Sequence, residues 1–244
     1  MIVNACETGW QVVYQAAHGL LAGALAMHFR SDLQSVHWCE TLAAIIQHDD
    51  CKVEAYGRAR LTPAGAPLDF TELSMTDEER SDESARRLAT AFVKHRWLGL
   101  LQSQHIECLY AGQPVNAVLK RLLASECKRR QQVLRELKVE AYELEYAYQL
   151  LHWCDRCSLI LAQQQLPAMQ RRVEIIHALT DETYTIAQRE DDSLAVDPWP
   201  FAEDEFQVAV EYRLLDQLSF SSEEQLQIAL EQAPVRELQW KLRY

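Results

Sequence analysis

The spacing of hydrophobic residues divides the chain into a helical part and a strand-rich part. Up to about residue 165, apolar residues recur at the period of a helix with one buried face. The helices expected from this pattern cover residues 16–29, about 33–48, 76–95, 97–110, about 115–139 and about 142–164. After Pro167 the hydrophobic runs become short and alternating or β-branched, which is typical of strands separated by polar turns.

Local signals refine this division. "MIVNA" and "WQVVYQ" flank Glu7-Thr8-Gly9 and predict an N-terminal hairpin. Thr76 with Glu79, and Ser221 with Glu224, have the spacing of a capping box at a helix start. The second of these pairs predicts one short helix within the strand-rich part.

We therefore expect an α+β protein that is mainly α and forms a single domain over residues 1–244. Its helical body covers residues 15–165. Residues 1–14 and 170–244 form a β-rich appendage with a small antiparallel sheet and one short helix, and the N-terminal hairpin is expected to complete that sheet.

Composition places the chain among globular proteins, since 48% of its 244 residues are hydrophobic and it has only seven glycines and seven prolines. It shows no apolar run long enough for a membrane helix and no signal-peptide pattern, so a soluble cytoplasmic protein without a membrane partner is expected. Seven scattered cysteines fit free thiols in a reducing compartment. The formal charge of -12 argues against nucleic acid as a partner.

Several polar residues fall on apolar helix faces, where burial without a partner is costly. Asp49 follows Leu42, Ile45 and Ile46 at helical spacing. Asp155, His105 and His18 share faces with apolar residues in the same way. Each of them alone can be explained as a hydrogen-bonded core residue or a helix-end residue. All four can also be explained by one divalent metal ion, such as Mn, Fe, Ni, Zn or Mg.

The order His18, His48-Asp49, Asp155 resembles the H…HD…D signature of the HD superfamily of metal-dependent phosphohydrolases. The resemblance implies that these four side chains bind a divalent metal on an HD-like helical body. His105 would match an additional histidine that some members use for a second metal. Lys52 stands where several members read H-D-x-G-K, with Cys51 in place of the glycine.

A narrower resemblance covers nearly the whole chain. The segments "MIV", "YQAAHGLLAGALA", "AIIQHDD", "LTPAGAPLDF", "LLQSQHIECLY", "YQLLHWCDRCSL" and "VDPWPF" resemble, in this order, the uncharacterised bacterial family called domain of unknown function 3891. Members of that family usually continue the HDD motif with Gly-Trp, whereas this chain has Cys51-Lys52. The difference leaves the implied ligands intact and changes the residues that follow them.

These observations and the resemblance predict a metal-dependent hydrolase that acts on a small phosphorylated substrate, a phosphate ester. Besides the four ligands, His105 is a further ligand or a phosphate contact, Asp50 a base that orients water, and Lys52 a phosphate contact. Gln15, one turn before His18, either orients its imidazole or is an exposed helix-start residue. The alternatives are a di-iron oxygenase on the same scaffold and a degenerate protein that binds a ligand or partner, with hydrogen-bonded polar core residues.

Overall fold

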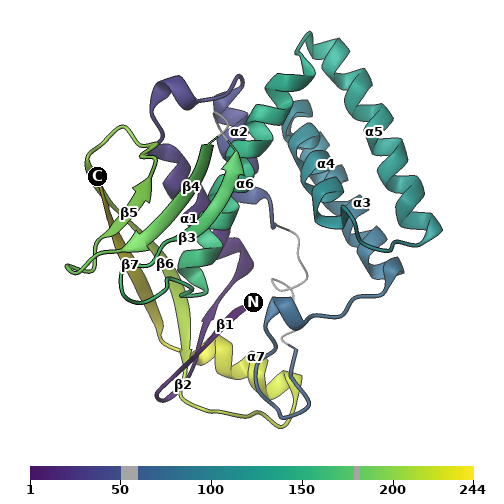
Figure 1. The fold of residues 1–244 in the computed structure, drawn as a ribbon. Coiled ribbons are helices and arrows are strands. Elements are labelled where there is room, and N and C mark those ends of the chain that lie inside the picture. Colours follow the sequence, from purple (N-terminus) through teal and green to yellow (C-terminus); the bar gives the residue numbers. More distant parts are fainter. Residues whose placement is uncertain (51–59, 179–181) are drawn as a thin grey trace.

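The computed structural model describes residues 1–50, 60–178 and 182–244 and consists of a helical body beside a seven-stranded β-sheet (Figure 1). Two helices of the body, α1 and α6, pack directly against the sheet. Helix α2 packs on α1 and α6, α4 packs on α2 and α6, and α3 and α5 pack on α4. The sheet therefore supports the two central helices, and the remaining helices of the body are built on these.

The helices of the body lie where helical periodicity predicts them. Their bounds, with that of the later short helix, are α1 Gln15–Met27, α2 Trp38–Gln47, α3 Asp77–Lys94, α4 Arg96–Tyr110, α5 Ala117–Leu137, α6 Ala141–Ala162 and α7 Glu223–Gln232. Thr76 and Glu79 form the expected capping box at the start of α3. At α7 the prediction is one residue off, because Ser222 rather than Ser221 accepts the hydrogen bond that caps the helix.

The second helix is shorter than expected. The chain first forms a 3-10 turn at Ser31–Leu33, and α2 begins only at Trp38. His37, directly before α2, has a left-handed backbone conformation with φ 53°. A right-handed helix cannot pass through such a residue, so the apolar pattern before it does not extend α2.

The strands join into one sheet in the order β1-β2-β6-β7-β5-β4-β3. Their bounds are β1 Ile2–Cys6, β2 Gly9–Val13, β3 Val173–Ala178, β4 Glu182–Gln188, β5 Leu194–Asp197, β6 Glu205–Leu215 and β7 Val235–Arg243. The N-terminal hairpin joins the sheet through antiparallel pairing of β2 with β6, as expected.

The prediction of a small antiparallel sheet is wrong in size and in type. The sheet has seven strands, and it is mixed because β5 and β7 run parallel and pair at Leu194 and Leu242. The last strand, β7, lies between β6 and β5. The alternation within a strand predicts which face is buried but not which neighbours the strand takes, so this order is not readable from the pattern.

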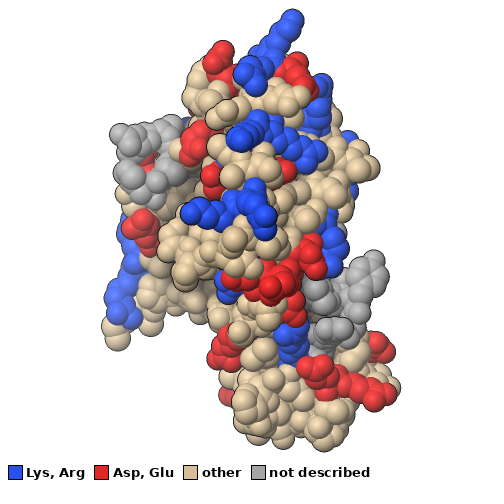
Figure 2. All heavy atoms as spheres, turned by 90° about the vertical axis from the view of Figure 1, so that its right-hand side faces the viewer, with Lys and Arg blue, Asp and Glu red and all other residues tan. Residues whose placement is uncertain are grey.

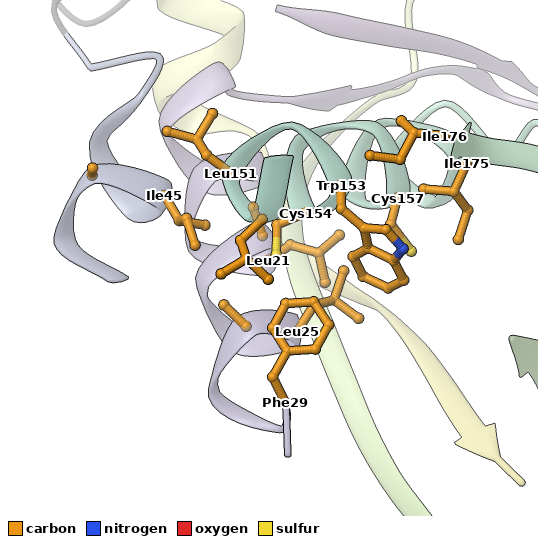
Figure 3. Packing of buried hydrophobic residues seen from close by; sticks show 14 of the residues in the cluster. Leu21, Leu25, Phe29, Ile45, Leu151, Trp153, Cys154, Cys157, Ile175 and Ile176 are labelled. Carbon is orange, nitrogen blue, oxygen red and sulfur yellow. The ribbon is translucent and has the colours of Figure 1, made fainter. Parts of the chain in front are cut away.

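The main core lies where α1 and α6 meet the sheet (Figure 3). Figure 3 shows side chains of α1, α2, α6, β3 and the segment after α1 packed together: Leu21, Leu25, Phe29, Ile45, Leu151, Trp153, Cys154, Cys157, Ile175 and Ile176. Burial raises the pKa of the Cys154 and Cys157 thiols, so this C-x-x-C pair is part of the core and not a reactive pair. A smaller core joins α7 to the opposite face of β2.

Two glycines of α1 allow α2 to approach closely. An added Cβ at Gly19 would overlap the backbone oxygen of Ile46, and one at Gly23 would overlap the Ile46 side chain. Glycine is the residue that permits such close helix contact because it has no side chain. The contact brings the end of α2 against the first turns of α1.

The basic residues of α5 alternate with acidic partners. Arg129 pairs with Glu126, and Arg130 with Glu107 of α4. Figure 2 shows Lys and Arg side chains interspersed with Asp and Glu on the visible face, rather than gathered in one basic patch. None of the helices in the described ranges is long and apolar enough to span a membrane.

Candidate metal centre

Three helices bring two histidines and two aspartates together. His18 lies on the inward face of α1, on the same side as Leu21, and is fully buried. His48 is the residue that ends α2, Asp49 follows it, and both are buried. Asp155 lies in the middle of α6 with 13% of its side chain exposed. The four residues predicted from the sequence therefore meet in one place.

The two imidazoles face the two carboxylates. His18 Nε2 lies 3.2 Å from Asp49 Oδ2 and 3.9 Å from Asp155 Oδ1. His48 Nε2 lies 3.2 Å from Asp155 Oδ1 and 3.8 Å from Asp49 Oδ2. Among the residues that the structure describes, His18, His48 and Asp49 form the one group whose potential ligand atoms all lie within 4.8 Å of one another, and Asp155 is not part of that group.

The other ring nitrogen of each imidazole, Nδ1, donates a hydrogen bond. His48 Nδ1 lies 2.7 Å from the carbonyl oxygen of Ile45, which can only accept. His18 Nδ1 lies 3.0 Å from Ser158 Oγ, and that hydroxyl donates its own hydrogen to the carbonyl oxygen of Asp155. A neutral imidazole that donates through Nδ1 presents a lone pair at Nε2. In the neutral form of each ring, this lone pair faces a carboxylate oxygen.

Burial and charge act on these groups in opposite directions. Burial lowers the pKa of His18, although its bond to Asp49 opposes this. Burial also lowers that of His48, but the charges of Asp155 and Asp49 outweigh burial, so the pKa of His48 is raised. For Asp155, burial raises the pKa, but the charge of His48, its hydrogen bond and the charge of His18 together outweigh burial, so the pKa of Asp155 is lowered. The centre therefore favours positive charge between its nitrogens and oxygens.

Arg87 of α3 contacts this centre from the side of α3. The buried guanidinium donates through Nη2 to the carbonyl oxygen of His48, and Nη2 lies 3.5 Å from Asp49 Oδ1. With its amide oxygen turned toward Arg87, Gln102 accepts from Nη2 at 3.0 Å and from Nε at 3.3 Å. Nη1 lies 3.7 Å from Glu83 Oε1. These contacts hold the end of α2 and the Asp49 carboxylate in place.

Arg87 and Ser158 were not singled out in the sequence, although helical phase could have identified both. Arg87 shares the buried face of α3 with Ser84, Leu88 and Ala91. Ser158 follows Asp155 by three residues on α6 and is fully buried. A charged or hydroxyl residue on a buried face is the same signal that identified Asp49.

His105 lies next to the centre but outside its ligand group. Its ring is 5.4 Å from that of His48 and nearly perpendicular to it. The Nδ1 atom is buried and meets no hydrogen-bond partner within residues 1–50, 60–178 and 182–244. Burial, followed by the positive charges at His48 and Arg87, lowers the pKa of His105 to about 3. The imidazole is thus neutral and available beside His48.

The remaining predicted site residues have different positions. Asp50 is half-buried and, with Gln47, Arg87 and Lys94, lines a small hollow on the α3 side of the cluster. Gln15 is the first residue of α1 and is buried, which excludes the exposed helix-start alternative. Lys52 and Cys51 lie outside the described residues.

A helical body, a mixed sheet and a buried cluster of two histidines and two aspartates define the class as an α+β protein with a candidate metal centre. The chain belongs to the family described as "Protein of unknown function (DUF3891)", whose model matches residues 1–217. No curated protein and no solved structure matches the chain.

Proposed function

We propose that this protein is a metal-dependent hydrolase of the HD type that cleaves a phosphate ester, with His18, His48, Asp49 and Asp155 as metal ligands. The observation that carries the proposal is that Nε2 of His18 and Nε2 of His48 each lie 3.2 Å from a carboxylate oxygen. When the imidazoles are neutral, their lone pairs and the anionic oxygens repel at this distance unless a cation, either a proton or a metal ion, lies between them. The order of the four residues along α1, α2 and α6 supports a relationship to the HD superfamily.

The donor set fits a divalent ion. Metal–ligand distances of about 2.1 Å place neighbouring ligand atoms roughly 3.0–3.4 Å apart around one ion. The closest nitrogen–oxygen pairs here are 3.2 Å apart, and the others 3.8 and 3.9 Å. Two imidazoles and two carboxylates suit Mn, Fe, Ni, Zn or Mg.

When bound, the ion supplies a Lewis acid for a phosphate oxygen and a water molecule acidic enough to give hydroxide near neutral pH. The chain supplies the surroundings. Ser158 and the Ile45 carbonyl orient the two imidazoles, and Arg87 orients Asp49. We assign Asp50 as the base that orients water, Lys52 as a phosphate contact, and His105 as a further ligand or phosphate contact.

Two other functions use the same residues. A di-iron oxygenase would require a second ion, for which neutral His105 is the neighbouring donor. A ligand- or partner-binding protein without metal would require protonated imidazoles paired with carboxylates, and the 3.2 Å separation of His48 and Asp155 also suits that pairing. Two irons per chain with a visible absorption band would identify the first, and a metal-free protein the second.

The test is hydrolysis of a panel of phosphate esters by purified protein, after chelation and after addition of each divalent ion. We expect phosphate release that chelation abolishes and one or more ions restore. Asp49→Asn and Asp155→Asn should lose the activity, while Asp216→Asn, at an exposed position distant in sequence, should keep it. Metal-loaded protein that releases no phosphate from any ester would contradict the proposal.

A further inference from the structure

A cleft of about 550 Å³ lies beside the metal centre. It is bounded by α3, the end of α4 and the segment 68–75, with Met1 and Arg60 at its edge. Its volume lies within the range of small-molecule sites, about 300–1,000 Å³. The cleft is therefore large enough for a ligand of several rings or an equivalent chain.

Arg87 connects this cleft to the centre. Its side chain lines the cleft, and its Nη2 lies 3.5 Å from Asp49 Oδ1. Leu109, which also lines the cleft, follows His105 by one turn of α4. A single side chain, that of Arg87, thus lies between the centre and the cleft.

One part of the cleft wall is apolar, and some of its side chains are exposed. Its hydrophobic lining consists of Leu68, Phe70, Leu73, Met75, Leu109 and Tyr110. Leu73 is 37% exposed and Leu109 is 40% exposed, which leaves large apolar side chains facing the same space. Apolar surface gathered in a concave site beside polar groups is typical of ligand binding.

Charged residues of both signs line the cleft in equal number: Arg60, Arg80, Arg86 and Arg87 with Asp69, Glu79, Asp82 and Glu83. Asp69 accepts from the backbone N–H groups of Val3 and Thr71, and Glu79 accepts from that of Thr76. Arg87 is engaged by His48, Asp49 and Gln102, with 4% of its side chain exposed. The lining therefore does not favour a ligand that carries another strongly anionic group besides its phosphate.

We propose that this cleft binds the organic part of the substrate, and that the substrate is a phosphate monoester with an apolar group of ring size or larger. This inference rests on the proposed function for the position of the phosphate. The apolar group would cover Leu73 and Leu109 while the phosphate lies at the metal centre. A small polar ester would leave this surface exposed to water and gain nothing from it.

The experiment compares 1-naphthyl phosphate with methyl phosphate, using Mn²⁺-loaded protein and measuring both equilibrium binding and hydrolysis. We expect 1-naphthyl phosphate to bind about tenfold more tightly, because its ring loses contact with water. Leu109→Lys and Leu73→Lys should remove most of this preference without changing the metal content. Leu218→Lys, at a residue that is 66% exposed and does not line the cleft, is the matched control and should keep it.

Equal binding of the two esters, or a preference that survives both cleft substitutions, would overturn the inference. The binding measurement separates it from the proposed function. If 1-naphthyl phosphate binds in the cleft but neither ester is hydrolysed, the ligand site stands and the phosphohydrolase fails. If both esters are hydrolysed with the same KM, the hydrolase stands and the cleft assignment fails.

Discussion

His18 and His48 are each held from the side that faces away from the carboxylates. Ser158 and the Ile45 carbonyl accept their Nδ1 hydrogens, which sets the ring orientation and the tautomer. Arg87 holds the carboxylate of Asp49 in a comparable way. Partners of this kind commonly change metal affinity by about 10–100-fold, so we expect these three contacts to matter although none of them touches the ion.

Arg87→Met should raise the Kd for Mn²⁺ about 10–100-fold, because Asp49 and the end of α2 lose their common donor. It should also lower the free energy of unfolding by about 1–3 kcal/mol, since a buried carbonyl oxygen is left without its partner. Calorimetric titration and urea unfolding measure the two effects.

Arg86→Met is the control for this substitution, because Arg86 is the exposed neighbour of Arg87 on α3. It should change neither quantity. Arg87→Lys keeps the charge but not the several donors, and its Kd should lie between those of the wild type and Arg87→Met. An unchanged Mn²⁺ affinity in Arg87→Met would exclude Arg87 as a positioning residue.

His105 predicts a specific dependence of stability on pH. Its pKa is about 3 in the folded protein and ordinarily 6.5, so below pH 6.5 the unfolded chain binds the extra proton. The contribution of neutral His105 to the free energy of unfolding is complete above pH 6.5 and is lost as the pH falls toward 3. His105→Phe, which cannot bind a proton, should reduce the loss of unfolding free energy between pH 7 and pH 5 by about 2 kcal/mol.

Urea unfolding of the chelated protein at the two pH values tests this prediction. His37→Asn replaces an exposed histidine with a residue that tolerates its left-handed backbone, and it should keep the wild-type pH dependence. The same pH dependence in His105→Phe and in the wild type would show that His105 is not buried in its neutral form.

Helices α1 and α2 meet through a contact that has no room for a side chain at Gly19. The obstacle there is the backbone oxygen of Ile46, whereas at Gly23 it is the side chain of the same residue. Because His48 follows Ile46 by two residues, the separation of the two helices sets the distance between His18 and His48. Close packing at the helix contact therefore determines the geometry of the metal centre.

Gly19→Ala should push α2 away from α1, lower the melting temperature and weaken Mn²⁺ binding. Overpacking costs about 1–3 kcal/mol, which exceeds the gain of up to about 1 kcal/mol from replacing a helix glycine by alanine. Gly23→Ala meets side-chain carbons of Ile46 rather than its backbone, so it should cost less than Gly19→Ala in both measurements. Equal effects of the two substitutions would contradict this account of the contact.

Helical phase in the sequence was sufficient to place Asp49, His18 and Asp155 on inward faces. The same helical phase places Arg87 on the buried face of α3. Because α3 contains many charged residues, one arginine among them gives no distinct signal in the sequence. Phase could not show that His105 stays outside the ligand group, because that depends on how far α4 lies from α2. Cys108 and Leu109, about one turn after His105 on α4, are exposed.

In the molecule as a whole, the sheet positions the two helices that carry three of the residues around the metal centre. Helix α1 carries His18, and α6 carries Asp155 and Ser158, which contact the imidazoles. Both helices pack on the sheet. The alternation of each strand was readable, but the parallel pairing of β5 with β7 depends on segments almost fifty residues apart. Such long-range pairing has no local signal, which is why the sheet was expected to be smaller and antiparallel.

The most direct test of the central claim is the metal content of the purified protein, measured by mass spectrometry before and after incubation with Mn²⁺ and removal of free ion. We predict one ion per chain for the wild type and for Asp216→Asn, and far less for Asp49→Asn and Asp155→Asn. A wild type that retains no ion, or Asp49→Asn with the same content as the wild type, would contradict the claim that these four side chains bind a metal.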